Sequence, residues 1–121
     1  MPNPIVHFEI MGSDSAKTQE FYSDLFGWTI SSDNPANYGL AFTQDDDGLG
    51  INGGIGGADQ GGGIYVAVYA QVDDPQAYLD KAVSMGAKEI IPVTEVPGMP
   101  IVVAMFADPD GNCIGLVKDA Q

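Results

Sequence analysis

The chain has 121 residues, the length of one ordinary domain, and its 17 acidic residues outnumber four lysines, with no arginine, to give a formal net charge of −13. This charge excludes nucleic acid and anionic membrane surfaces as expected partners. The single cysteine, Cys113, excludes an internal disulfide and suits a cytoplasmic location. We expect no membrane span and no signal peptide, because neither a long apolar segment nor a basic N-terminal region is found in the sequence.

The first half of the sequence predicts a strand, a helix and three further strands. Residues 4–11 alternate in the manner of a strand, with His7 and Glu9 on one face. Apolar residues at helical spacing, between an aspartate that can cap and a glycine that can terminate, predict a helix over residues 15–26. The remaining strands are expected at residues 28–30, 38–43 and about 49–55.

The second half repeats this pattern. Alternation predicts a strand over residues 64–72, and Asp74 followed by Pro75 predicts the start of a helix over residues 75–85. Three short strands, which favour antiparallel hairpins, are then expected at residues 89–93, 101–106 and 113–117. A β-α-β-β-β order found twice indicates an internal duplication within an α+β fold.

These elements define the predicted domain organisation. The chain is expected to form a single domain over residues 1–121. Its parts are module one at about 4–56, a glycine-rich linker at about 56–63 and module two at about 64–118.

Three segments carry a family resemblance. The opening strand has a central histidine, His7. Residues 21–28 resemble the helix motif F-Y-x-x-x-L-G-W/F, and residues 106–116 are similar to the signature D-P-D-G-N-x-x-E-L. In this order the chain resembles the vicinal-oxygen-chelate superfamily of glyoxalases, bleomycin-resistance proteins and extradiol dioxygenases. The resemblance implies two βαβββ modules forming a curled mixed sheet around a cavity with helices outside, and a homodimer.

The resemblance also implies where a divalent metal would bind. His7 matches the family's first-strand ligand, but Gly115 replaces the glutamate of the eighth strand. The fourth-strand position falls near Asn52 or Gly53, and residues 65–67 offer no histidine for the fifth strand. One good ligand out of four is too few to hold an ion tightly, so we expect no metal and no other cofactor. The alternative is zinc, nickel, iron or manganese bound through His7.

Alternation along the strands predicts which side chains line the cavity. The expected ligand-binding residues are His7, Glu9, Tyr65, Tyr69 and Cys113. His7 and Glu9 are also the candidate catalytic residues, as a proton shuttle. Each also has a purely structural interpretation, in which the histidine is a relic held by hydrogen bonds and the glutamate faces solvent at the cavity mouth. In the same interpretation the tyrosines only pack and the thiol is an inert small apolar group.

Two functions follow from these residues. The first is a metal-free protein that binds a small neutral or cationic organic molecule in its cavity, which the acidic composition suits. The second is an enzyme of the glyoxalase type, a lyase or isomerase, or a dioxygenase-type enzyme, either dependent on a metal through His7 or metal-free with Glu9 and His7 as acid and base.

Overall fold

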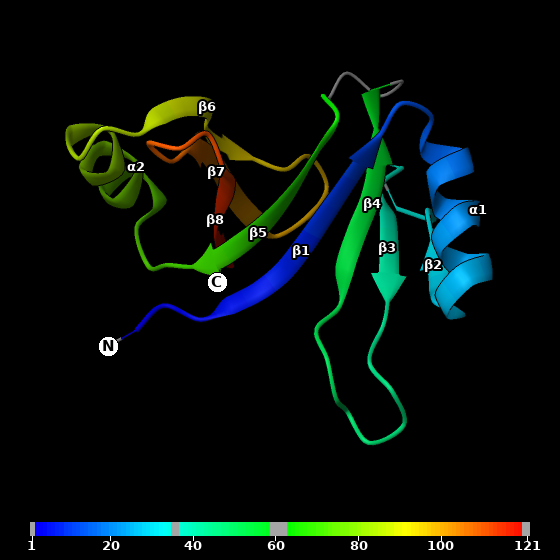
Figure 1. Ribbon diagram of the computed structural model, residues 1–121. Coiled ribbons are helices and arrows are strands. Elements are labelled where there is room, and N and C mark those ends of the chain that lie inside the picture. The colour runs from blue at the N-terminus through cyan, green and yellow to red at the C-terminus, as the bar shows by residue number, and fades with distance from the viewer. Residues whose placement is uncertain (1, 35–36, 59–62, 120–121) are drawn as a thin grey trace. The chain divides into compact units, whose positions relative to one another are not determined.

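The computed structural model describes residues 2–34, 37–58 and 63–119. Within these ranges the chain forms the expected order of elements twice (Figure 1). The elements are β1 (Ile5–Gly12), α1 (Ser15–Phe26), β2 (Thr29–Ser31), β3 (Gly39–Phe42), β4 (Gly53–Gly57), β5 (Tyr65–Gln71), α2 (Pro75–Ser84), β6 (Lys88–Glu95), β7 (Ile101–Ala107) and β8 (Cys113–Asp119).

The chain divides into two compact units. The N-terminal unit is residues 7–66, and the C-terminal unit is residues 67–121 together with residues 1–6. In the N-terminal unit the strand order is β2-β3-β4-β1, and in the C-terminal unit it is β6-β7-β8-β5. The pairs β1–β4 and β5–β8 are parallel and the other described pairs within each unit are antiparallel. The predicted α+β fold, its mixed sheet and its duplicated βαβββ modules are therefore confirmed.

Matching aspartate caps start the two helices. A carboxylate oxygen of Asp14 accepts a hydrogen bond from the backbone N–H of Lys17 at 3.3 Å, and Asp74 accepts from that of Ala77 at 3.1 Å. These bonds satisfy backbone donors that have no partner within the first turn. Helix α1 has the predicted bounds and ends at Gly27 in the left-handed conformation, whereas α2 ends one residue before the predicted end.

The Asp74 cap leads to a testable prediction. Asp74→Ala is expected to lower the free energy of unfolding by about 1 kcal/mol, because the first turn of α2 loses its side-chain acceptor. Urea denaturation followed by circular dichroism measures the change. Asp73→Ala removes the same charge next door without removing the cap, so an equal loss in both variants would contradict this assignment.

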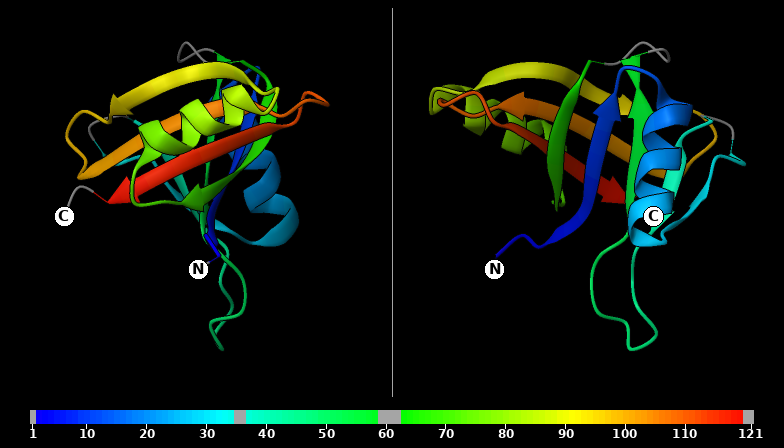
Figure 2. Two further views of the ribbon diagram at one scale, coloured as in Figure 1. Left: turned by 90° about the vertical axis from the view of Figure 1, so that its left-hand side faces the viewer. Right: turned by 45° about the vertical axis from the view of Figure 1, so that its right-hand side comes forward.

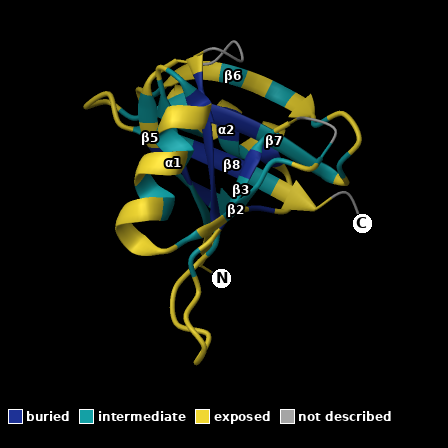
Figure 3. Ribbon diagram, turned by 90° about the vertical axis from the view of Figure 1, so that its right-hand side faces the viewer, coloured by how far each residue is buried: buried dark blue, intermediate teal, exposed yellow. Residues whose placement is uncertain are grey.

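Aromatic rings fill the space between α1 and the sheet of the N-terminal unit. The Trp28 ring lies 5.6 Å from both Phe8 of β1 and Tyr22 of α1, measured between ring centroids. Gln19 of α1 donates from Nε2 to the backbone carbonyl of Ile55 in β4 at 2.9 Å, which fixes the helix on this face. The outward side of α1 is exposed (Figure 3).

The C-terminal unit has its own apolar core beneath α2. The helix lies against β6, β7 and β8 (Figure 2). Buried side chains from the helix, from β7 and β8 and from the residue that follows β5 meet there: Leu79, Ala104, Leu116 and Val72, with Tyr78, Val93 and Phe106 packed around them. Each module therefore buries one sheet face under its own helix, which leaves the opposite face of the sheet available for other side chains.

The glycine-rich segment differs from its prediction. Strand β4 spans Gly53–Gly57, not residues 49–55. The Asn52 side chain accepts backbone hydrogen bonds from Thr43 at 3.0 Å and Gln44 at 3.3 Å, and so closes the loop where a strand was expected. Two residues of the predicted linker 56–63 thus belong to β4, and residues 59–62 lie outside the described residues.

Candidate functional site

A chain of hydrogen bonds joins four side chains on the face of the N-terminal sheet opposite α1. His7 and Glu9 lie two residues apart on β1, so both side chains point to this face. Nε2 of His7 lies 3.0 Å from the Tyr38 hydroxyl, which donates to one carboxylate oxygen of Glu9 at 2.9 Å. The Tyr65 hydroxyl donates to the other oxygen at 2.9 Å. Three segments far apart in the sequence thereby meet at one carboxylate.

Glu9 is buried, with 7% of its surface exposed. The alternative that it faces solvent at a cavity mouth is therefore wrong. A buried carboxylate is tolerated only when its oxygens accept hydrogen bonds, and the hydroxyls of Tyr38 and Tyr65 supply one to each. The Glu9 carboxyl group is thereby held in a fixed position by two phenol donors.

The direction of these bonds defines the protonation of His7. The single hydroxyl proton of Tyr38 is donated to Glu9, so the Tyr38 oxygen acts as the acceptor toward the imidazole. Nε2 of His7 must then carry a proton. Burial lowers the pKa of His7 below its usual value of 6.5, and the nearby Glu9 charge opposes this effect without reversing it. The imidazole is therefore neutral at pH 7, protonated on Nε2.

The lowered pKa of His7 predicts a pH dependence of stability. Because the folded state binds a proton less readily than the unfolded state, the free energy of unfolding should fall as pH drops below about 6.5 and down through the folded pKa. The chain has one histidine, so its ring protons can be titrated by NMR without ambiguity. Glu9→Gln should lower the pKa of His7 further, since it removes the opposing charge; a raised pKa in this variant would contradict the assignment.

Glycines make room for the aromatic rings of the site. A Cβ atom at Gly54 of β4 would overlap the ring and hydroxyl of Tyr38. The Asn34 side chain holds the Tyr38 backbone on both sides, donating to its carbonyl at 2.6 Å and accepting from its N–H at 3.0 Å. The Tyr38 ring therefore lies over a bare strand with its hydroxyl between His7 and Glu9. Tyr38 belongs to the site although the sequence did not single it out.

The remaining candidate residues lie in the C-terminal unit. Tyr69 of β5 is buried, and its ring occupies the space that a Cβ atom at Gly115 of β8 would need. Cys113 is half-buried and lies beside Ala67 in the parallel β5–β8 ladder. The structure thus brings His7, Glu9 and Tyr65 together in one group, and describes Tyr69 and Cys113 as part of the other unit.

The positions that correspond to the family's metal ligands have other contacts. The Asn52 side-chain oxygen accepts two backbone hydrogen bonds, Tyr65 donates to Glu9, and the Tyr69 ring covers Gly115. Among residues 2–34, 37–58 and 63–119, no three histidine, cysteine or acidic side chains are grouped so that they could hold a metal ion. In the same residues, no helix is long and apolar enough to cross a membrane.

Comparisons with known proteins agree with this fold. At 28% identity, 89% of this chain matches CFP32 of Mycobacterium tuberculosis, a protein whose name places it among the glyoxylases, and the match spans 42% of that relative's length. Methylmalonyl-CoA epimerase from Mycobacterium tuberculosis superposes with a TM-score of 0.63 at 18% identity, covering 97% of this chain and 88% of the epimerase.

A second solved structure gives the same result, with a family model in agreement. A glyoxalase/bleomycin resistance protein/dioxygenase superfamily member from Vibrio splendidus superposes with a TM-score of 0.62 at 17% identity, covering 98% of this chain and 100% of that one. The model of the Glyoxalase/Bleomycin resistance protein/Dioxygenase superfamily matches residues 4–116. Since this match covers most of the sequence, the chain belongs to the glyoxalase/bleomycin resistance protein/dioxygenase superfamily.

Proposed function

We propose that this chain binds a small organic molecule bearing a positive charge or several hydrogen-bond donors, and that it does so without a resident metal ion. The observation that carries this proposal is the hydrogen-bonded group His7–Tyr38–Glu9–Tyr65 on the face of the N-terminal sheet opposite α1. A fixed carboxylate flanked by two aromatic rings suits a cation, which gains from both the charge and the ring faces. Tyr69 and Cys113 stay predicted ligand contacts.

The charge of the protein supports the same class of ligand. With a formal net charge of −13 and no arginine, the chain as a whole attracts cations and lacks the planar donor that best binds carboxylates and phosphates. A neutral His7 adds no positive charge to the site. An anionic ligand at Glu9 would therefore meet a like charge with no compensating cation in the hydrogen-bonded group.

The absence of a resident metal is proposed on the chemistry of the positions involved. Of the family's four ligand positions, only His7 offers a good donor, and its Nε2 is engaged with Tyr38. The ring of Tyr69 fills the place of the eighth-strand glutamate. These residues do not fit a tetrahedral or octahedral ion, so we assign no step of any reaction to one.

The proposal is tested with a small-molecule library containing cationic and neutral aromatic compounds, screened in the presence of a chelator. Ligand-observed NMR should find compounds that bind the wild type and that displace one another from a single site. Tyr65→Phe should weaken them about fivefold to tenfold, because the Glu9 carboxylate loses one of its two phenol donors and shifts. Tyr22→Phe, a matched change on α1 that removes a phenol hydroxyl outside this group, should leave binding unchanged. Binding only when chelator is withheld would contradict the proposal.

A second candidate function is metal-free proton transfer. The Tyr38 hydroxyl lies within hydrogen-bond distance of both the imidazole of His7 and the carboxylate of Glu9, so a proton could pass between them. In an enzyme of this kind, of the lyase or isomerase type, exchange of a carbon-bound substrate proton with solvent deuterium would survive a chelator. It would be lost in Glu9→Gln, whereas a binding protein would show no exchange at all.

Two expectations about the protein's surroundings belong to this proposal. We propose that the chain works in the cytoplasm, where its single thiol stays reduced, and that it forms a homodimer as the family resemblance implies. Sedimentation equilibrium measures the second: a mass of twice 12.7 kDa is expected, and a monomer at micromolar concentration would contradict it.

A further inference from the structure

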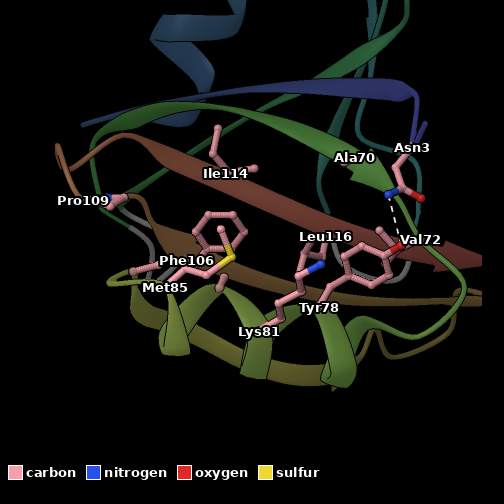
Figure 4. Close-up of a pocket in the computed structure, with 12 residues that line it drawn as sticks. Asn3, Ala70, Val72, Tyr78, Lys81, Met85, Phe106, Pro109, Ile114 and Leu116 are labelled. Carbon is pink, nitrogen blue, oxygen red and sulfur yellow. Dashed lines mark hydrogen bonds between the residues drawn. The ribbon is translucent and has the colours of Figure 1, made fainter. Parts of the chain in front are cut away.

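A pocket in the C-terminal unit lies on the opposite side of the sheet from the face that carries Tyr69 and Gly115. It has a volume of about 380 Å³ and lies between α2 and the strands β5 and β8 (Figure 4). Ile114 and Leu116 of β8 line it, because they alternate with the residues that point to the other face. Phe106 and Met85 complete an apolar wall. This volume is within the usual range of small-molecule sites, about 300–1,000 Å³.

The internal duplication identifies the residue that leaves room for this pocket. Ala82 follows its helix cap Asp74 by the same number of residues as Tyr22 follows Asp14. In the N-terminal unit the Tyr22 ring stacks on Trp28 and fills the space beside the helix. In the C-terminal unit alanine leaves that space open, and Ala82 lines the pocket.

The lining of this apolar pocket includes one cationic side chain, that of Lys81. Lys81 on α2 points its side chain toward β8, beside the ring of Tyr78 (Figure 4). Its ammonium group has no hydrogen bond or ion pair with the described residues. The neighbouring acid on the helix, Asp80, is bound by the side chain of Gln76 at 2.9 Å. The protein has only four basic residues, and one of them points into this apolar pocket. The pocket therefore favours a ligand with an anionic group.

The rim of the pocket holds a second polar group. Asn3 donates from Nδ2 to the hydroxyl of Tyr78 at 3.1 Å, so the phenol is fixed at the end of the pocket near Val72 (Figure 4). The Tyr78 hydroxyl accepts this bond through its oxygen, so its hydrogen can be donated to a ligand. The pocket therefore combines apolar walls with a cation and a hydroxyl donor at one end.

We propose that this pocket is a second binding site, separate from the His7–Glu9 group, and that it takes an amphipathic carboxylate of medium chain length. The alkyl chain lies among Met85, Phe106 and Ile114, and the carboxylate contacts Lys81 and the Tyr78 hydroxyl. The overall negative charge of the protein does not prevent this, since charges farther than about 8 Å are largely screened at physiological salt. The ligand proposed here is an anion, whereas the ligand proposed for the first site is a cation. The difference follows from the charged residue in each site, which is Lys81 here and Glu9 there.

Three ten-carbon probes that differ only in their head group test the proposal: decanoate, decanol and decyltrimethylammonium, each below its micelle concentration. Isothermal titration calorimetry should rank decanoate first, and the methyl NMR signal of Met85 should shift on binding. Lys81→Met keeps the apolar stem and should weaken decanoate about fivefold while leaving decanol within about twofold. Lys17→Met removes one charge from the exposed side of α1 and should change neither.

Filling the pocket gives an independent test. Ala82→Phe restores an aromatic residue at the position of Tyr22 and should abolish binding of both decanoate and decanol. A cation bound more tightly than decanoate, equal affinity in wild type and Lys81→Met, or an unshifted Met85 methyl would overturn the proposal. Tyr65→Phe should leave decanoate binding intact, so failure at this pocket is distinguishable from failure at the first site.

Discussion

Replacing Gly54 by alanine is expected to lower the free energy of unfolding by about 2–4 kcal/mol and to detach Tyr38 from His7 and Glu9. The added Cβ atom would occupy the place of the Tyr38 ring and hydroxyl. The ring must then move, and the buried Glu9 carboxylate loses a donor that it needs. Urea denaturation measures the loss of stability, and NMR titration of His7 reports the broken contact as a shifted pKa.

A matched glycine controls for the effect of an added methyl group on the backbone. Gly63→Ala places its Cβ atom at an ordinary 3.8 Å from the nearest ring atom, that of Tyr65, and should change stability by less than about 0.5 kcal/mol. In a Tyr38→Ala background, Gly54→Ala should cost much less than in the wild type, because the two groups compete for the same space. Equal costs in both backgrounds would show that the ring does not lie over Gly54.

Restoring the family's glutamate by Gly115→Glu is expected to destabilise the protein by about 3 kcal/mol or more without creating a metal site. The new side chain would collide with the Tyr69 ring and place a carboxylate in a buried position. Only His7 among the other ligand positions offers a good donor, so nickel or zinc should bind no more tightly than to the wild type. Thermal unfolding and metal titration by calorimetry measure the two effects.

Gly115→Ala separates steric conflict from buried charge. It should also destabilise the chain, by about 1–3 kcal/mol, because its Cβ atom alone overlaps the Tyr69 ring. The double variant Tyr69→Ala/Gly115→Ala should be less destabilised than the sum of the two single variants. Additive losses of stability would contradict the overlap between the Tyr69 ring and a side chain at position 115.

The sequence was most informative where local patterns carry the structure. Aspartate caps and helical spacing gave α1 its bounds, and the repeated β-α-β-β-β order predicted both modules. Alternation placed His7 and Glu9 on one face, and they are indeed neighbours in one hydrogen-bonded group. These signals depend on residues close together in the chain, which is why they can be read without a structure.

What the sequence could not predict depends on pairing between distant strands. Tyr38 reaches Glu9 because Leu40 pairs with Gly54, and Gly54 pairs with Glu9, and no local pattern sets that register. Strand β4 has glycine at four of its five positions, so it shows neither alternation nor β-branched residues, and its start was predicted too early. Tyr38 opens the strand predicted over residues 38–43, but no local pattern distinguishes it as a site residue.

The divalent metal content of the purified, dialysed protein, measured by elemental mass spectrometry, tests most directly the claim that aromatic rings have replaced the family's metal site. With Tyr69 over Gly115 and Tyr38 bound to His7, we predict nickel, zinc, iron and manganese far below one ion per chain. A near-stoichiometric content of any one of these metals, lost together with ligand binding or turnover in His7→Ala, would contradict the account.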